Sequence, residues 1–174
     1  MHMNVSEVLE KPSIAISRSE LLPPHRTPWG EEARIRLSSS DTHGALSIVD
    51  ITVPPGFGPP RHLHHREDEI LRVVNGRLVV WTPDRSFALE PGEVISLPKG
   101  VPHTWRSYGD QPVRFVMDCL PGGFENIYPL VVEHQVMLDD IVSLAKIAVE
   151  FGIEVVGPPL NDEDAELIIW GVDI

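Results

Sequence analysis

Short apolar runs separated by polar turns fill the middle of the chain. The runs are rich in Val and Ile, and the pairs Asn-Gly, Pro-Asp, Pro-Gly and Gly-Asp between them favour turns. Seven such runs occur, at residues 45–53, 69–74, 77–82, 86–90, 93–98, 103–108 and 112–120. Short strands at regular spacing with turn signals between them are typical of an antiparallel sandwich or barrel. The pattern therefore predicts an all-β domain.

The pattern changes on both sides of this region. Residues 1–35 are mixed in character and contain Pro23-Pro24, so we expect an N-terminal arm there. Beyond residue 125, steps of three and four predict a helix with an apolar stripe of Met137, Ile141, Leu144, Ala148 and Phe151. We expect it to cover the open side of the β domain; a subunit contact and a lid over a pocket are the alternatives. The chain thus divides into an arm (1–35), a β domain (36–125) and a C-terminal helix and tail (126–174).

Composition limits the classes of function. The 174 residues suit one domain with its own core. The net charge of −12 argues against nucleic acid, whose phosphates are bound by Lys and Arg, and against an anionic membrane surface. No apolar run approaches the roughly 20 residues of a membrane helix, and no signal-peptide pattern begins the chain. Cys119 is the one cysteine, which excludes an internal disulfide, and we expect a cytoplasmic protein.

Residues 56–76, GFGPPRHLHHREDEILRVVNG, concentrate side chains that can bind a metal. His62 and His64 are two residues apart, so in an extended strand their imidazoles face the same side. Neutral imidazole is a good ligand for first-row transition metals, and Glu69 offers a carboxylate nearby. We expect Asn75-Gly76 to close a hairpin that makes the flanking runs neighbours. Taken alone, the stretch is also compatible with a polar loop that binds nothing.

A second stretch, GEVISLPKGVPHTWRS at residues 92–107, supplies a further imidazole. Together the two stretches resemble the two sequence motifs of the cupin superfamily. The first reads Gly56, five residues, His62-x-His64, four residues, Glu69, six residues, Gly76; the second reads Gly92, five residues, Pro98-x-Gly100, two residues, His103. The resemblance implies that residues 36–125 form an antiparallel jelly-roll (double-stranded β-helix) barrel. It also implies one divalent transition metal held by His62, His64, Glu69 and His103; Fe, Mn, Ni, Zn and Cu are all compatible.

The surrounding segments narrow the resemblance. The stretch from residue 26 to Glu69, with PGGFE at 121–125 and FGIEVVGPP at 151–159, is similar to single-domain bacterial cupins of the quercetin 2,3-dioxygenase-like group. One position departs, because the second motif usually ends in Asn and this chain has Ser107. That position is structural in the family, so we expect a different turn and unchanged metal ligands.

The residues beside the predicted ligands leave some choices open. We expect His65, Glu67 and Asp68 to form a solvated turn, with Glu67 in place of Glu69 as the alternative if the strand begins earlier. Trp105 has the same parity as His103, so it either packs in the core or forms an aromatic wall beside the metal. Arg72 has the opposite parity from Glu69 and should point away. We expect Cys119 to be a small buried residue.

Three imidazoles and one carboxylate leave positions open on a metal that takes five or six ligands, as a catalytic site does. We expect a metal-dependent oxidoreductase of dioxygenase type, in which Glu69 acts as general base on a small aromatic or enediol substrate. The alternatives are a non-redox isomerase or lyase acting on sugars or keto acids, and a non-catalytic cupin that binds a small ligand. We also expect a homodimer, because edge strands need cover and the arm is long enough to reach a neighbour.

Overall fold

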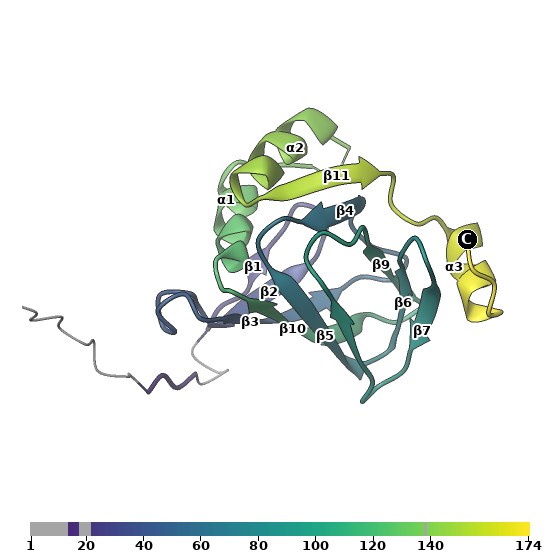
Figure 1. The fold of residues 1–174 in the computed structure, drawn as a ribbon, viewed down its shortest axis with the longest axis horizontal. Helices are drawn as coiled ribbons and strands as arrows, with labels where there is room; N and C mark the ends of the chain where they lie inside the picture. Colours follow the sequence, from purple (N-terminus) through teal and green to yellow (C-terminus); the bar gives the residue numbers. More distant parts are fainter. Residues whose placement is uncertain (1–13, 18–21, 138) are drawn as a thin grey trace, which may run out of the picture.

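The fold is a β barrel, and the helices come from the C-terminal part of the chain (Figure 1). It is seen in a computed structural model that describes residues 14–17, 22–137 and 139–174. The largest sheet has six strands in the order β1-β2-β3-β10-β5-β8. Their bounds are β1 (His25–Arg26), β2 (Glu32–Leu37), β3 (Ser47–Val53), β10 (Val113–Leu120), β5 (Asp68–Asn75) and β8 (Val94–Leu97). All strand pairs in it are antiparallel.

Two smaller antiparallel sheets complete the barrel. One contains β7 (Ser86–Leu89), β6 (Arg77–Trp81) and β9 (Thr104–Tyr108), and the other contains β11 (Ile153–Gly157) and β4 (Arg61–His64). The predicted all-β jelly roll is confirmed, and each of the seven predicted runs contains a strand. The helical elements of the described residues are a 3₁₀ turn, η2 (Phe124–Asn126), and the helices α1 (Ile127–Glu133), α2 (Ile141–Glu150) and α3 (Asp162–Ile169).

The predicted pairing of β5 with β6 is wrong. The Asn75-Gly76 turn is present, with Gly76 at φ +79°, but β5 pairs with β10 and β8 while β6 pairs with β7 and β9. The turn lies against the start of β10, where a Cβ on Gly76 would come within 2.8 Å of Val113 Cγ2. This close packing turns the chain from one sheet into the other, so the two strands do not become partners.

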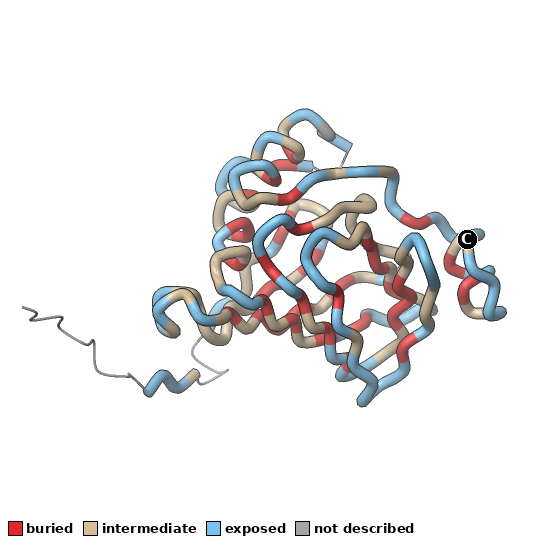
Figure 2. The backbone as a smooth tube through the Cα atoms, in the orientation of Figure 1, coloured by how far each residue is buried: buried red, intermediate tan, exposed pale blue. Residues whose placement is uncertain are grey.

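The core lies between the sheets, where one face of most strands is buried (Figure 2). Along β10, Val113, Phe115, Met117 and Cys119 are buried and alternate with residues that are not, as a strand with one inward face requires. The expectation for Cys119 is confirmed. Val79 on β6 instead belongs to a second cluster under α3, formed with Leu160, Ala165 and Ile168.

The N-terminal segment contributes to the barrel. Strand β1 and most of β2 fall within the predicted arm, residues 1–35, and β2 pairs with β3. Much of that segment, residues 1–13 and 18–21, lies outside the described residues. The boundaries at residues 36 and 126 stay predictions.

The C-terminal segment holds three helices and a strand instead of one helix and a tail. Helix α2 is the predicted helix, and Asp140 caps it by accepting a hydrogen bond from Ser143 N over 3.1 Å. Leu144 and Ala148 are buried, whereas Met137 lies before the helix and is exposed. None of the helices in the described part of the chain has the length and apolar character needed to cross a membrane.

Candidate metal centre

The four residues that the two motifs supply come together in the structure. His62 and His64 lie on β4, Glu69 lies on β5, and His103 directly precedes β9. One ligand atom from each lies within 4.8 Å of the others. We call this group the histidine–glutamate cluster.

Backbone hydrogen bonds explain why the two stretches of sequence meet. His62 N donates to His103 O over 2.9 Å, and His103 N donates back to His62 O over 2.7 Å. In the turn before His103, Gly100 N donates to His64 O over 2.7 Å. Gly100 has φ +79°, a conformation that suits glycine. The turn of the second motif therefore holds the strand of the first, and strand alternation sends both β4 imidazoles to the same side.

The polar atoms of the cluster are close and almost completely enclosed. His103 Nε2 lies 3.0 Å from Glu69 Oε2, and His64 Nε2 lies 3.4 Å from Glu69 Oε1. The rings of His62 and His103 are 4.6 Å apart between centroids. His64, Glu69 and His103 are 1%, 2% and 0% exposed. His62 is half-buried and lines a cavity.

The outer contacts of the histidines fix which nitrogen faces the centre. His62 Nδ1 lies 2.8 Å from Pro60 O, and His103 Nδ1 lies 2.9 Å from Val101 O. A carbonyl oxygen only accepts hydrogen bonds, so both Nδ1 atoms carry a proton, and in the neutral rings that bind metals both Nε2 atoms present lone pairs.

These lone pairs make the donor set fit a divalent metal ion. His103 Nε2 lies within hydrogen-bond distance of Glu69 Oε2, so either a proton or a bound metal ion could join these two atoms. His64 Nε2 is buried and has no hydrogen-bond partner among the described residues. Nε2 ligation with Nδ1–H held by an outer partner is the usual arrangement of metal-binding histidines.

Burial and mutual contact set the charges of the cluster. Burial, followed by His103 and His64, lowers the pKa of His62 to about 3, so its imidazole is neutral at neutral pH. Burial alone would raise the pKa of Glu69, but His64 and His103 outweigh it and lower that pKa to about 2. Burial also lowers the pKa of His64, but Glu69 and Glu67 outweigh it and leave that pKa raised. A metal that binds here would compete with protons for these side chains.

The prediction that Glu67 is solvated is wrong. Glu67 is 3% exposed, and its Oε2 lies 3.3 Å from Nδ1 of His64. It contacts the side of the ring that faces away from Glu69, so it does not replace Glu69 in the cluster. Glu67 precedes Glu69 by two residues and therefore has the same parity along the chain, which was the signal for its burial. His65 and Asp68 are exposed, as expected.

We expect Glu67→Gln to weaken metal binding by about tenfold, the lower end of the roughly 10–100-fold cost of losing an outer-shell partner. The amide keeps the shape and can still accept a hydrogen bond, but it removes the negative charge that makes His64 a better donor. Titration against a competing chelator measures the affinity. Glu154→Gln serves as the control, because the Glu154 side chain is half exposed and contacts His65, which lies outside the cluster. Equal affinities in all three proteins would contradict the role of Glu67.

The cluster borders a cavity of about 110 Å³. Four of its wall residues carry a titratable group: Glu31, His62, Glu69 and Tyr128. The remaining walls are aromatic and apolar: Trp29, Pro59, Pro60, Trp105, Met117, Phe124, Ile127, Val131, Leu144, Ala148, Ile153 and Val155. Trp105 fulfils both interpretations of its parity, since its ring packs edge-on against Phe115 at 5.0 Å and also lines the cavity.

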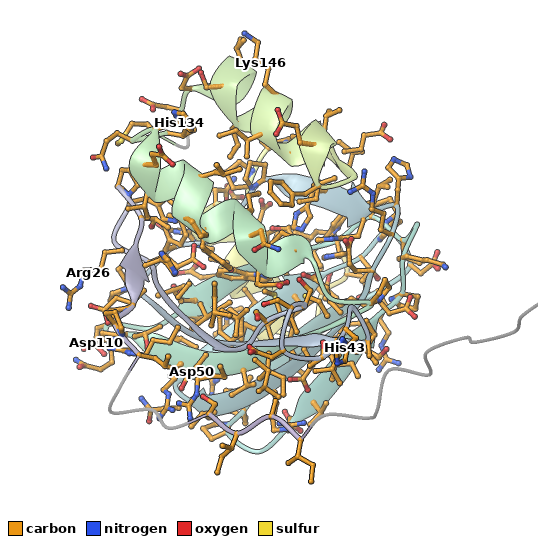
Figure 3. The ribbon with its side chains drawn as sticks, turned by 90° about the vertical axis from the view of Figure 1, so that its left-hand side faces the viewer. Arg26, His43, Asp50, Asp110, His134 and Lys146 are labelled. Carbon is orange, nitrogen blue, oxygen red and sulfur yellow. The ribbon has the colours of Figure 1, made fainter. Side chains whose placement is uncertain are left out.

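The helices close this cavity on one side. Figure 3 looks onto α1 and α2, which lie across that part of the barrel with His134 and Lys146 on their outer surface. Leu144 and Ala148 of α2 face inward and belong to the walls. The helix therefore both covers the barrel and shapes the cavity beside the cluster.

Comparison with known proteins agrees with the motifs and the fold. Residues 49–118 match the family described as Cupin domain. This part of the chain is a cupin domain. The chain is 29% identical over 107 residues to the tetracenomycin polyketide synthase protein TcmJ of Streptomyces glaucescens. The aligned residues cover 61% of this chain and 70% of that protein.

Two further comparisons place this cupin among proteins of different activity. It is 25% identical over 95 residues to quercetin 2,3-dioxygenase of Bacillus subtilis, covering 55% of this chain but only 28% of that protein. Its fold is similar to that of the polyketide cyclase RemF from Streptomyces resistomycificus, with a TM-score of 0.53 and 24% identity over 62% of this chain and 80% of that one. The likeness to RemF concerns the fold alone.

Ser107 stands where the second motif usually has Asn, and in this cupin it has a structural role. Ser107 Oγ donates to Pro54 O over 2.6 Å and accepts a hydrogen bond from Phe57 N over 2.9 Å. These bonds fasten the turn that leads into β4. At Gly58 in that turn, a Cβ would lie 1.9 Å from Trp105 O, so the turn admits no larger residue there.

Glu31 is a cavity residue of this cupin that the sequence analysis missed, because it lies in the predicted arm and belongs to no motif. It is 6% exposed, and Trp29 Nε1 donates to its Oε2 over 2.9 Å. Tyr128 supplies a second hydrogen bond. Burial raises the pKa of Glu31 to about 7, although the bonds from Trp29 and Tyr128 oppose the rise.

We expect Glu31 to make the stability of the metal-free protein depend on pH. A carboxyl with a raised folded-state pKa contributes most below its ordinary pKa of 4.5, and this contribution is lost as pH rises through about 7. The loss amounts to about 3 kcal/mol between these limits. Urea unfolding of the wild type and Glu31→Gln at several pH values, both with chelator, measures the difference between them. A difference that stays constant with pH would contradict the raised pKa.

Proposed function

We propose that this cupin is a metal-dependent oxidoreductase of dioxygenase type that acts on a small aromatic or enediol compound. The observation that carries the proposal is the position of the histidine–glutamate cluster at the wall of a cavity that is otherwise largely apolar and aromatic. A few polar groups in an apolar cavity are typical of a small-molecule site.

In this proposal His62, His64, Glu69 and His103 hold one divalent transition metal. When bound, the metal supplies Lewis acidity and, if it is a redox metal such as Fe, Mn, Ni or Cu, electron transfer. The lone pairs on the inward nitrogens and the ionised state of Glu69 support this ligand set.

The remaining chemistry belongs to the side chains of the chain itself. Glu69 is ionised, and in this proposal it accepts the proton of a substrate hydroxyl that lies beside it, whose acidity a bound metal would increase. The aromatic walls, with Trp105 and Phe124 among them, suit a flat ring and exclude water. A sugar fits poorly, because most of its hydroxyls would meet apolar walls and lose their hydrogen bonds to water.

A second candidate function is a non-redox reaction on an aromatic compound of polyketide type. The similarity to the Streptomyces glaucescens polyketide synthase protein, at 29% identity, favours it. The same cluster could polarise the oxygens of such a compound, with Glu69 moving a proton and no oxygen consumed.

Oxygen consumption separates the two candidates. The protein, purified without a His tag, is analysed for its metals and then loaded in separate samples with Fe(II), Mn(II), Ni(II), Cu(II) or Zn(II). Each sample is tested with flavonols, catechols and enediols in an oxygen electrode. We expect uptake with at least one redox metal and none with zinc. No uptake with any combination would reject the oxidative proposal and leave the non-redox candidate.

We also propose that the protein is a homodimer. Ile14 and Ile16 are 99% and 75% exposed, and Ser17 beside them accepts a hydrogen bond from Arg36 Nε at the surface of the sheet. A second copy would cover this apolar segment. We expect light scattering to give about twice the chain mass of 19.4 kDa at micromolar concentration. A single-chain mass at that concentration would reject the dimer.

A further inference from the structure

Glu31 is a buried acid that the proposed chemistry of the cluster does not use. Its carboxyl accepts a hydrogen bond from Trp29 and interacts with the hydroxyl of Tyr128, and neither residue belongs to the cluster. No Lys or Arg of the described residues forms an ion pair with it. A buried carboxylate held by neutral donors alone costs stability, so the fold itself gives no reason for an acid at this position.

The surrounding structure nevertheless holds Glu31 in a fixed place. Its N–H donates to Thr27 Oγ1 over 3.0 Å, and Thr27 N donates to its carbonyl over 2.9 Å, which forms a tight loop before β2. Gly30, at φ +91°, allows this loop. Trp29 stacks on Phe57 with ring planes 7° apart, so the indole that donates to Glu31 is held as well. Fixed neighbours on both sides are typical of a group positioned for binding.

We infer that Glu31 is a ligand-contacting residue that accepts a hydrogen bond from a hydroxyl of an aromatic compound bound in the cavity, at a point separate from the histidine–glutamate cluster. The inference rests on the proposed function for the aromatic class of the substrate. It adds that the substrate carries a hydroxyl beyond the oxygens that face the cluster.

The chemistry of the cavity selects this class of ligand. Glu31 lines the same cavity as His62 and Glu69, and the walls between are largely apolar. An aliphatic polyol would leave hydroxyls unpaired against those walls, whereas a phenol presents one donor and a flat apolar body. Burial raises the pKa of the Tyr128 hydroxyl well above its ordinary value, so Tyr128 stays protonated and serves as a donor to Glu31.

Phenol and toluene test the inference, because they have nearly the same shape and differ in one hydroxyl. Each is titrated into the full chain saturated with Zn(II), which has no redox chemistry, and the affinity is measured from the NMR resonance of the Trp29 indole N–H. We expect the wild type to prefer phenol at a pH above 7, where Glu31 is ionised, and Glu31→Leu to lower the phenol-to-toluene affinity ratio about tenfold, the loss of one hydrogen bond to a charged group. His134→Ala, on the outer surface of the helices, should keep the preference, because it leaves the cavity unchanged.

The outcomes are distinct. An equal ratio in the wild type and Glu31→Leu, or no binding of phenol to the wild type, would overturn the inference. Loss of the preference in His134→Ala to the same extent as in Glu31→Leu would show that the preference does not depend on Glu31 and would also overturn the inference. Since the titration needs no oxygen and no turnover, its failure is separate from a failure of the oxygen-uptake test.

Discussion

Replacing His103 by alanine should remove most of the metal from the protein. The substitution deletes one of four ligands and leaves the oxygen of Glu69 that faces it without a partner. We expect the affinity to fall by more than the roughly 10–100-fold predicted for an outer-shell change. Metal at 100 times its Kd should stabilise the wild type by about 2.7 kcal/mol, and this gain should vanish in His103→Ala.

Elemental analysis and melting curves with and without metal, run in parallel, measure both effects. His134→Ala is the matched control, since His134 is an exposed histidine on the outer surface of the helices. The melting temperature of the metal-free variant reports any damage to the fold, because the backbone bonds between residues 62 and 103 do not need the imidazole. Unchanged metal occupancy in His103→Ala would remove this residue from the site.

The second large effect concerns Glu69. Glu69→Gln keeps the size of the side chain but removes the charge that accepts a proton. If Glu69 acts as general base, activity per bound metal should fall by about 10²- to 10⁴-fold. Oxygen uptake divided by metal content, measured in the same samples, separates this effect from simple loss of metal. Activity that follows metal content in proportion would show that Glu69 only holds the metal.

The sequence predicted the strands and the cluster because both depend on spacing. Alternating burial along β10 is a period-two pattern, and the positions of the four cluster residues follow from two motifs. Partner strands depend on contacts that no short stretch contains. Asn75-Gly76 is a hairpin signal, yet the packing of the turn against Val113 directs the chain into another sheet. Glu67 was misplaced for a similar reason, since a polar stretch reads as solvent-exposed until the fold encloses it.

The walls of the cavity were the least predictable part of the site. Trp29, Glu31 and Tyr128, together with the wall residues of α2 and β11, lie outside residues 49–118, the part of the chain that matches the cupin family. These segments carry no motif, and their approach to the cluster depends on long-range packing. The family match therefore predicts the metal ligands, while the ligand that the cavity accepts depends on the segments around the family domain.

Strand β11 also has a consequence for association between chains. It pairs along β4 with Val155 opposite His62 and Ile153 opposite His64, and Gly152 O accepts a further bond from His65 N over 2.8 Å. Removing the C-terminal segment would leave every residue of the histidine–glutamate cluster in the chain but would uncover the hydrogen-bonding groups of β4. An open edge of this kind recruits strands from other molecules. Proteolytic trimming of the C-terminal segment should therefore lead to aggregation through the strand that carries two of the four cluster residues.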